Sequence, residues 1–142
     1  GVDSMEIGVD SAAVLTLPQV DSPKASRGRI VFYGTSILQG GCASRTGMCG
    51  TNIIQRELDI ECVNFGISGE GKMYMPMARM IAGMENVACY VIDPVPNCTE
   101  KQCDTLTCNF VKTIRAAHPD TPVIMLAGPL YPYSKFDSYF NK

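Results

Sequence analysis

Short apolar runs alternate with helix-like stretches from Arg29 onward. The runs are RIVFYG, ECVNFG, VACYVID and PVIMLAG, and the stretches between them lie around 48–58, from about 76 to 84, and from 100 to 117. Strands that are apolar throughout, rather than at alternate residues, are buried on both faces, which is typical of a parallel sheet covered by helices. The pattern therefore predicts an α/β domain with the order βαβαβαβ and right-handed crossovers.

The stretch from 100 to 117 is the clearest helix. Thr99 and Gln102 have the spacing of a capping box. The apolar residues behind them recur at steps of three and four, which predicts an amphipathic helix with one face on the sheet. These residues are Cys103, Leu106, Phe110, Ile114 and Ala117.

The residues before Arg29 differ in character. The segment SMEIGVDSAAVLTL places Met5, Ile7 and Val9 at alternate positions, which predicts two short strands. The following PQVDSPKASRG is polar and contains two prolines and a glycine, as linkers do. We therefore expect a short β appendage over residues 1–17, a linker over 18–28, and the α/β domain over 29–142.

Composition excludes two classes of partner. The chain has 142 residues and a net charge of -2, so it has no excess of basic residues with which to bind nucleic acid. No apolar run approaches the ~20 residues needed to cross a bilayer, and we expect no membrane interaction. The amino terminus also lacks the basic region and apolar stretch of a signal peptide.

Seven cysteines are present, and the odd number leaves at least one outside any intramolecular disulfide. Cys62 and Cys89 fall inside predicted buried strands. Cys98, Cys103 and Cys108 are spaced by five residues, a turn of about 140° on a helix, so neighbours do not share a face as metal ligands would. We expect no metal or other cofactor. The thiols are interpreted as small core residues. The alternative for two of them is one disulfide, which would form in an oxidising compartment.

The residues that follow the strands are the candidates for chemistry. Ligands of open parallel sheets bind beyond the carboxyl ends of the strands. GTSILQGG, GISGEG and DPVPN stand there, at residues 34–41, 66–71 and 93–97.

Each of these loops has two interpretations. Ser36 is either a nucleophile exposed on a strand-to-helix turn or part of a structural or phosphate-binding turn, although its loop lacks the lysine of a P-loop and the GxGxxG spacing. Gly69 either presents a backbone N–H to a developing oxyanion or makes a tight turn at positive φ. Asn97 either donates from its amide or caps the helix behind it.

YGTSI, NFGISGEG and DPVPN, in this order, resemble the first three signature blocks of the SGNH (GDSL-like) hydrolases. The resemblance covers roughly residues 29–128 and implies a flavodoxin-like three-layer α/β/α sandwich with a parallel sheet. It implies that Ser36 is the catalytic nucleophile and that the Ser36 N–H, the Gly69 N–H and the Asn97 side chain form the oxyanion hole. Thr35 departs from the usual GDS form at the residue before the serine.

The longer string IVFYGTSILQGGCASRTGM is similar to a bacterial subfamily in which a β-sandwich precedes the hydrolase domain. By this resemblance, residues 1–17 are a remnant of that sandwich. The resemblance further implies hydrolysis of carboxylic esters, with a small-molecule ester or an acetylated carbohydrate as substrate. It also suggests export to the periplasm or the cell exterior.

The resemblance is incomplete at the carboxyl end. The family finishes with a DxxH block that supplies the base, whereas the one histidine here, His118, ends the third helix and is expected to serve only its C-terminus. Four strands are visible where five are expected. We therefore expect a C-terminally incomplete domain that is inactive as it stands; the alternative is a catalytically dead binding module. An exposed sheet edge would favour self-association. Aromatic residues of the tail either line a groove or pack under further chain: Tyr131, Tyr133, Phe136, Tyr139 and Phe140.

Overall fold

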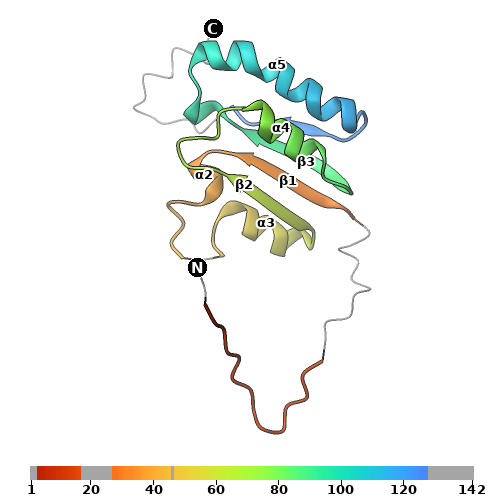
Figure 1. Cartoon of the computed structure of the whole chain (residues 1–142). Helices are drawn as coiled ribbons and strands as arrows, with labels where there is room; N and C mark the ends of the chain where they lie inside the picture. The colour runs from red at the N-terminus through yellow and green to blue at the C-terminus, as the bar shows by residue number, and fades with distance from the viewer. Residues whose placement is uncertain (1–2, 17–26, 46, 128–142) are drawn as a thin grey trace.

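Strands and helices alternate along the chain in the predicted order (Figure 1). The computed structural model describes residues 3–16, 27–45 and 47–127. The elements are β1 (Arg29–Gly34), α2 (Ser36–Gln39), α3 (Gly50–Leu58), β2 (Glu61–Gly66), α4 (Met75–Ala82), β3 (Val87–Asp93), the 3-10 turn η1 (Val95–Asn97), α5 (Glu100–Ala117) and β4 (Val123–Met125).

The sheet is entirely parallel and has the order β2-β1-β3-β4, which is the flavodoxin-like order over these strands. The central strand is β1, which is the first of the described strands along the chain. At its carboxyl end Gly34 lies opposite Gly66 of β2 and Asp93 of β3. The three loops singled out in the sequence therefore leave the sheet side by side.

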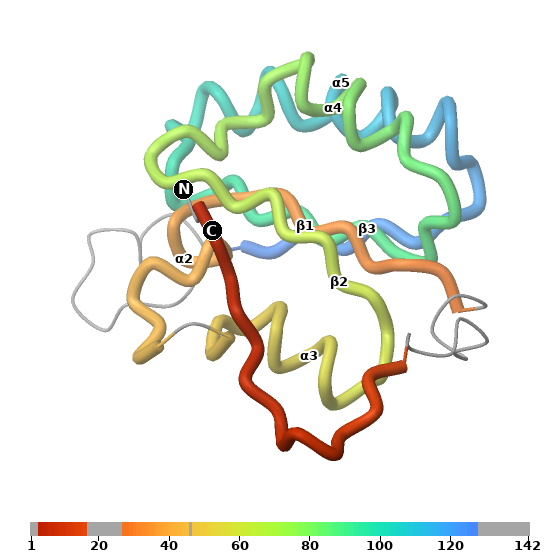
Figure 2. Tube along the Cα trace, turned by 60° about the horizontal axis from the view of Figure 1, so that its bottom comes forward, coloured from red at the N-terminus to blue at the C-terminus, as the bar shows by residue number. Residues whose placement is uncertain are grey.

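Helices cover both faces of the sheet. In Figure 2, α4 and α5 lie on one face and α3 lies on the other, which gives the predicted three-layer sandwich. The main core lies between the sheet and the α4–α5 pair, where alternate residues of β1 and β3 meet both helices. Its fully buried residues are Val31, Tyr33, Met73, Ala78, Ile81, Tyr90, Ile92, Phe110 and Ile114.

The α3 face is less completely filled. A hollow of about 610 Å³ lies beside α3, and it is lined by side chains from β1, β3 and β4 that point away from α4 and α5. Cys89 lines this hollow and is half-buried, as is Cys62 on β2. The prediction that these two thiols are buried was therefore wrong in degree, because one helix alone does not cover this face.

Helix boundaries differ slightly from the predictions. The first predicted helix begins at Gly50 rather than Met48, because Cys49 adopts the extended backbone of an N-cap. The second runs over Met75–Ala82 and ends at Gly83, whose N–H closes the last turn. The third, α5, has the predicted bounds and the predicted capping box of Thr99 and Gln102. The short helix α2 was not predicted.

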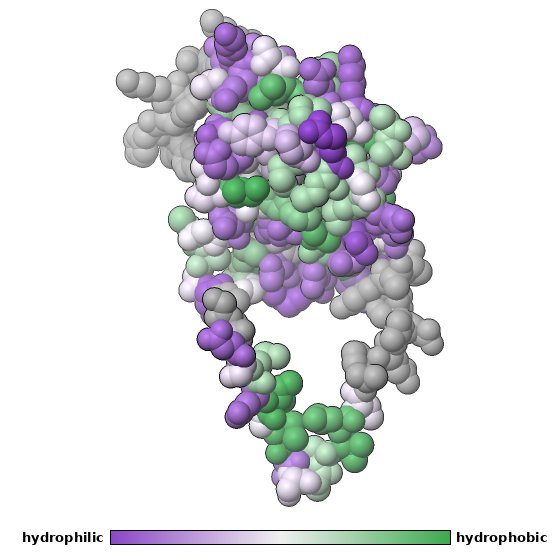
Figure 3. All heavy atoms as spheres, in the orientation of Figure 1, coloured by the Kyte–Doolittle hydropathy of each residue, from purple (hydrophilic) through white to green (hydrophobic). Residues whose placement is uncertain are grey.

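The amino-terminal segment forms no strand over its described residues 3–16, so the prediction of strands is wrong there. Apolar alternation needs a partner strand to pair with, and Met5 and Val14 instead remain 81% and 85% exposed. Apolar spheres mark this projecting segment in Figure 3. Residues 17–26 and the aromatic residues of the tail lie outside the described residues, and the division into appendage, linker and domain stays a prediction.

The strand β4 lies at an edge of the sheet, and no described strand pairs with its outer side. Ile124 and Met125 on this strand are 49% and 40% exposed. Self-association through this edge stays a prediction. Among the described helices, none is both long enough and apolar enough to span a bilayer.

Candidate active site

The loops after β1, β2 and β3 are packed against one another. The N–H of Ile67 donates to the carbonyl of Gly34 over 2.8 Å, which extends the pairing of β2 with β1 into the loop. A Cβ on Gly71 would lie only 2.1 Å from the same carbonyl oxygen, and a Cβ on Gly34 would lie 2.6 Å from the carbonyl oxygen of Asp93. Glycine is required at these positions because backbone meets backbone.

Ser36 is the first residue of α2, directly after the N-cap Thr35. Thr35 is fully buried, and its Oγ1 accepts a hydrogen bond from the N–H of Ile37 over 3.4 Å. The first N–H groups of a helix have no acceptor within the helix, so the N–H of Ser36 is available to a ligand. The turn therefore presents the hydroxyl and a backbone donor at one point.

A hollow of about 330 Å³ adjoins Ser36. Its walls come from α2 and from the loop between α2 and α3. The space beside the serine is small and mostly apolar. The lining residues are Ser36, Ile37, Gly40, Gly41, Cys42, Ala43, Met48, Cys49 and Gly50.

Asn64 on β2 fixes the position of α2, a role that the sequence analysis missed. Its Nδ2 donates to the carbonyl of Leu38 and to Oγ1 of Thr51, each over 2.9 Å, and its Oδ1 accepts from the N–H of Gly66 over 2.8 Å. One amide thus joins α2, α3 and the end of β2. The signal in the sequence is a lone polar residue inside an apolar run.

Asn97 at the end of η1 contacts the loop after β2. Its amide is assigned with Oδ1 toward the N–H groups of Gly69 and Gly71, at 3.3 and 3.2 Å, because this orientation gives both donors an acceptor. The opposite orientation offers one longer contact, from Nδ2 to the carbonyl of Ile67 at 3.4 Å. Gly69 has a φ of +73°, so it also makes the tight turn that was its alternative interpretation.

The sequence analysis treated Gly69 and Asn97 as independent donors, but in the structure they are bonded to each other. With Oδ1 of Asn97 on the two N–H groups, the donors of the side chain are the two hydrogens of its amide nitrogen. The structure thus brings Ser36, Gly69 and Asn97 to one edge of the sheet and couples the last two.

Asp93 is a buried carboxyl group that the sequence analysis did not single out. Its side chain is 4% exposed, and Oδ1 has no hydrogen-bond partner within the described structure. Burial raises the pKa of this carboxyl group, and a hydrogen bond from the Thr35 hydroxyl partly opposes that rise in pKa. The N-cap Thr35 therefore contacts a carboxyl group whose pKa is raised by burial.

We expect Asp93→Asn to remove a pH dependence of stability. A raised pKa in the folded state means that the folded protein binds the proton more tightly, so wild-type stability falls as pH rises from the ordinary Asp range through the raised pKa. Urea unfolding at several pH values measures this slope. The matched control is Asp104→Asn, on the exposed side of α5, which should follow the wild type; an unchanged slope in Asp93→Asn would contradict the assignment.

His118 lies far from this edge. It caps the carboxyl end of α5, its Nε2 bonds the carbonyl of Ala82 over 2.9 Å, and its ring meets Tyr90 edge to face. These contacts are the structural role expected of it. Since it is the one histidine of the sequence, no imidazole of this chain serves Ser36.

Cys49 is a second nucleophilic side chain in the hollow beside Ser36. A hydrogen bond with the Thr51 hydroxyl lowers the pKa of this thiol, and N–H groups at the start of α3 add to the lowering. Any acyl transfer in the hollow must therefore be assigned between Ser36 and Cys49 by experiment.

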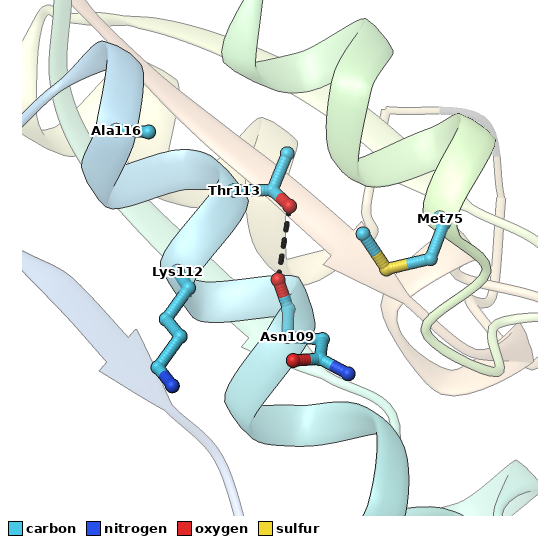
Figure 4. Close-up of a pocket in the computed structure, with 5 residues that line it drawn as sticks. All are labelled: Met75, Asn109, Lys112, Thr113 and Ala116. Carbon is cyan, nitrogen blue, oxygen red and sulfur yellow. Dashed lines mark hydrogen bonds between the residues drawn. The ribbon is translucent and has the colours of Figure 1, made fainter.

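Another hollow, of about 480 Å³, lies between α4 and α5 (Figure 4). Its five lining residues come from these helices alone, and its drawn hydrogen bond runs from Thr113 to the carbonyl of Asn109 within α5. It includes no residue of the three loops. No group of three or more potential metal ligands occurs among the described residues.

Comparison with known proteins places the chain in a family. A sequence profile of the GDSL-like lipase/acylhydrolase family matches residues 27–141. A crystal structure assigned as a GDSL-like lipase from Bacteroides ovatus ATCC 8483 is 41% identical, with a TM-score of 0.67 over 69% of this chain and 29% of that one.

The salicylyl-acyltransferase SsfX3 from a tetracycline biosynthetic pathway shares the fold, with a TM-score of 0.63 and 22% identity over 76% of this chain and 31% of that one. This chain therefore spans about a third of the length of either structure. No curated protein sequence matches it. Because the family profile covers well over half of the chain, the chain belongs to the GDSL-like lipase/acylhydrolase family.

Proposed function

We propose that this domain hydrolyses carboxylic esters with Ser36 as nucleophile. The observation that carries the proposal is the meeting of the three loops at one edge of the sheet, where Ser36 opens α2 beside a small hollow. A serine at the start of a helix has backbone N–H groups within reach of the oxyanion that forms when its hydroxyl attacks a carbonyl.

Two further donors complete the proposed oxyanion hole. The amide nitrogen of Asn97 is one, since Oδ1 is the atom of this amide that faces the two glycine N–H groups. The Gly69 N–H is held by that Oδ1, so it would donate to the oxyanion only by sharing its hydrogen or after the amide turns. Water then releases the acyl group, as in other hydrolyses through an acyl-enzyme.

The small hollow favours small acyl groups such as acetyl, since its walls are apolar and its volume is about 330 Å³. A carbohydrate as the alcohol part, and export from the cytoplasm, are carried over from the subfamily resemblance.

Exogenous imidazole provides the test, because the chain has no histidine placed to deprotonate Ser36. We expect the chain to hydrolyse p-nitrophenyl acetate slowly. Added imidazole should raise this rate by more than imidazole raises hydrolysis in the absence of the protein, since a base positioned beside the nucleophile typically gives 10²- to 10⁴-fold. Ser36→Ala should lose this increment.

Two variants complete the assay. Cys49→Ala separates acylation of that thiol from acylation of Ser36, and Ser11→Ala, an exposed residue of the amino-terminal segment, should keep the full increment. An increment that survives in Ser36→Ala would assign the chemistry elsewhere. If neither the wild type nor any of the variants shows an increment in rate with imidazole, the alternative of a catalytically dead binding module is favoured.

A further inference from the structure

We propose that Cys98 and Cys103 are a disulfide-forming pair that fastens the residue after Asn97 to the second turn of α5. Both thiols are free in the structure. The inference goes beyond ester hydrolysis and does not depend on it.

The geometry rests on the start of α5. Thr99 is the N-cap and makes a reciprocal capping box with Gln102, so Cys98 stands at the N′ position and Cys103 at N4. Side chains at N′ and N4 pack together in the hydrophobic staple that accompanies such boxes. Here both members of the staple are cysteines, and both pack against the same buried core.

The two thiols also influence each other's ionisation, because each is among the groups that shift the pKa of the other. Burial, together with the neighbouring thiol, raises the pKa of Cys98 to about 11. Burial also raises the pKa of Cys103, but the neighbouring Cys98 thiol partly offsets that rise, so Cys103 is the thiol that ionises first. Disulfides require two cysteines whose Cβ atoms lie close together, and the N′ and N4 positions beside a capping box are the two that pack together in a staple.

The reaction needs an oxidant, for which a small-molecule disulfide such as glutathione disulfide serves. The Cys103 thiolate attacks one sulfur of that disulfide, the S–S bond breaks, and one glutathione leaves as its thiolate. Cys98 then loses its proton and attacks the Cys103 sulfur, which expels the second glutathione. Two protein thiols are oxidised and one disulfide is reduced to two thiols.

Peptide mapping of the folded chain after oxidation tests the pair. Trypsin cuts after Arg79, Lys101 and Lys112, so residues 80–101 carry Cys98 and residues 102–112 carry Cys103. After incubation with glutathione disulfide at about pH 8.5, where more thiolate is present, we expect these peptides to be joined without reduction and separated by a reductant.

The controls come from the other cysteine in each peptide. Cys89→Ser and Cys108→Ser should keep the joined species, whereas Cys98→Ser and Cys103→Ser should lose it. Cys98→Ser should instead accumulate a glutathione adduct on residues 102–112, since the resolving thiol is gone. Circular dichroism of each variant confirms that it is folded.

The proposal is overturned by either of two results. One is a wild-type chain whose peptides remain separate, or join through Cys89 or Cys108, while the protein stays folded. The other is a joined species that persists in Cys98→Ser or Cys103→Ser.

Discussion

Gly71→Ala is expected to destabilise the fold by about 3 kcal/mol or more, at the upper end of the range for overpacked sites. The new Cβ would lie 2.1 Å from the carbonyl oxygen of Gly34, 2.4 Å from its carbonyl carbon and 2.9 Å from the N–H nitrogen of Thr35. All three are backbone atoms of the turn that carries Ser36, so no side chain can rotate to make room. The loop after β2 must therefore move away from β1.

Thermal unfolding followed by circular dichroism measures the effect, and a loss of this size lowers the midpoint by about 10 °C in a domain of this length. Two other glycines are matched controls. Gly50→Ala meets no atom within 4 Å at the start of α3 and should be neutral or slightly stabilising. Gly69→Ala meets none either but has a φ of +73°, so it should cost about 1 kcal/mol. If Gly71→Ala is no worse than Gly69→Ala, the close packing of the loops is contradicted.

Phe110→Ala is expected to cost about 3–5 kcal/mol, which is the usual range for truncating a buried aromatic side chain. Phe110 is fully buried on α5, and its ring stacks on Tyr33 with centroids 5.2 Å apart. Tyr33 belongs to the central strand, two residues before the N-cap Thr35. Truncation therefore opens a cavity between the layers, directly below the turn that carries Ser36.

Since a domain has only about 5–15 kcal/mol of stability, Phe110→Ala can leave much of the chain unfolded. Phe110→Leu keeps more of the apolar volume and should lose less, near 1.5 kcal/mol, and its denaturant midpoint remains measurable. Leu58→Ala, at a side chain that is 55% exposed, should stay within about 0.5 kcal/mol of the wild type. Equal losses in Phe110→Leu and Leu58→Ala would show that the layers do not depend on this contact.

The sequence was sufficient for the first three strands of the α/β domain, because each of these apolar runs ends at a residue that breaks it, whereas β4 stops at Met125, before the end of its run. Gly34, Gly66 and Asp93 close β1, β2 and β3 at the predicted positions. It was not sufficient for residues 3–16, where alternation was interpreted as strands. A strand is stable only when another strand pairs with it, and a local pattern does not contain that information.

The residues of the candidate site could likewise be predicted only in part. The nucleophile and its glycine-rich surroundings could be found from GTSILQGG, because the chemistry lies in the residues of one turn. Asn64 and Asp93 were missed because their roles depend on strand register, which brings β2 and β3 against the turn after β1. The bond between Asn97 and Gly69 is likewise a tertiary contact. The polar residue within each apolar run was the available signal.

The strand order has a consequence for synthesis of the chain on the ribosome. Of the described strands, β1 is made first and becomes the central one, and its two neighbours are β2 and β3. The hydrogen bonds between β1 and β3 can be completed only after residue 93 has emerged from the ribosome. One side of β1, next to the turn that carries Ser36, therefore has no paired strand while some sixty residues are added. Nascent chains arrested shortly before and shortly after β3 should therefore differ sharply in their resistance to proteolysis near Ser36.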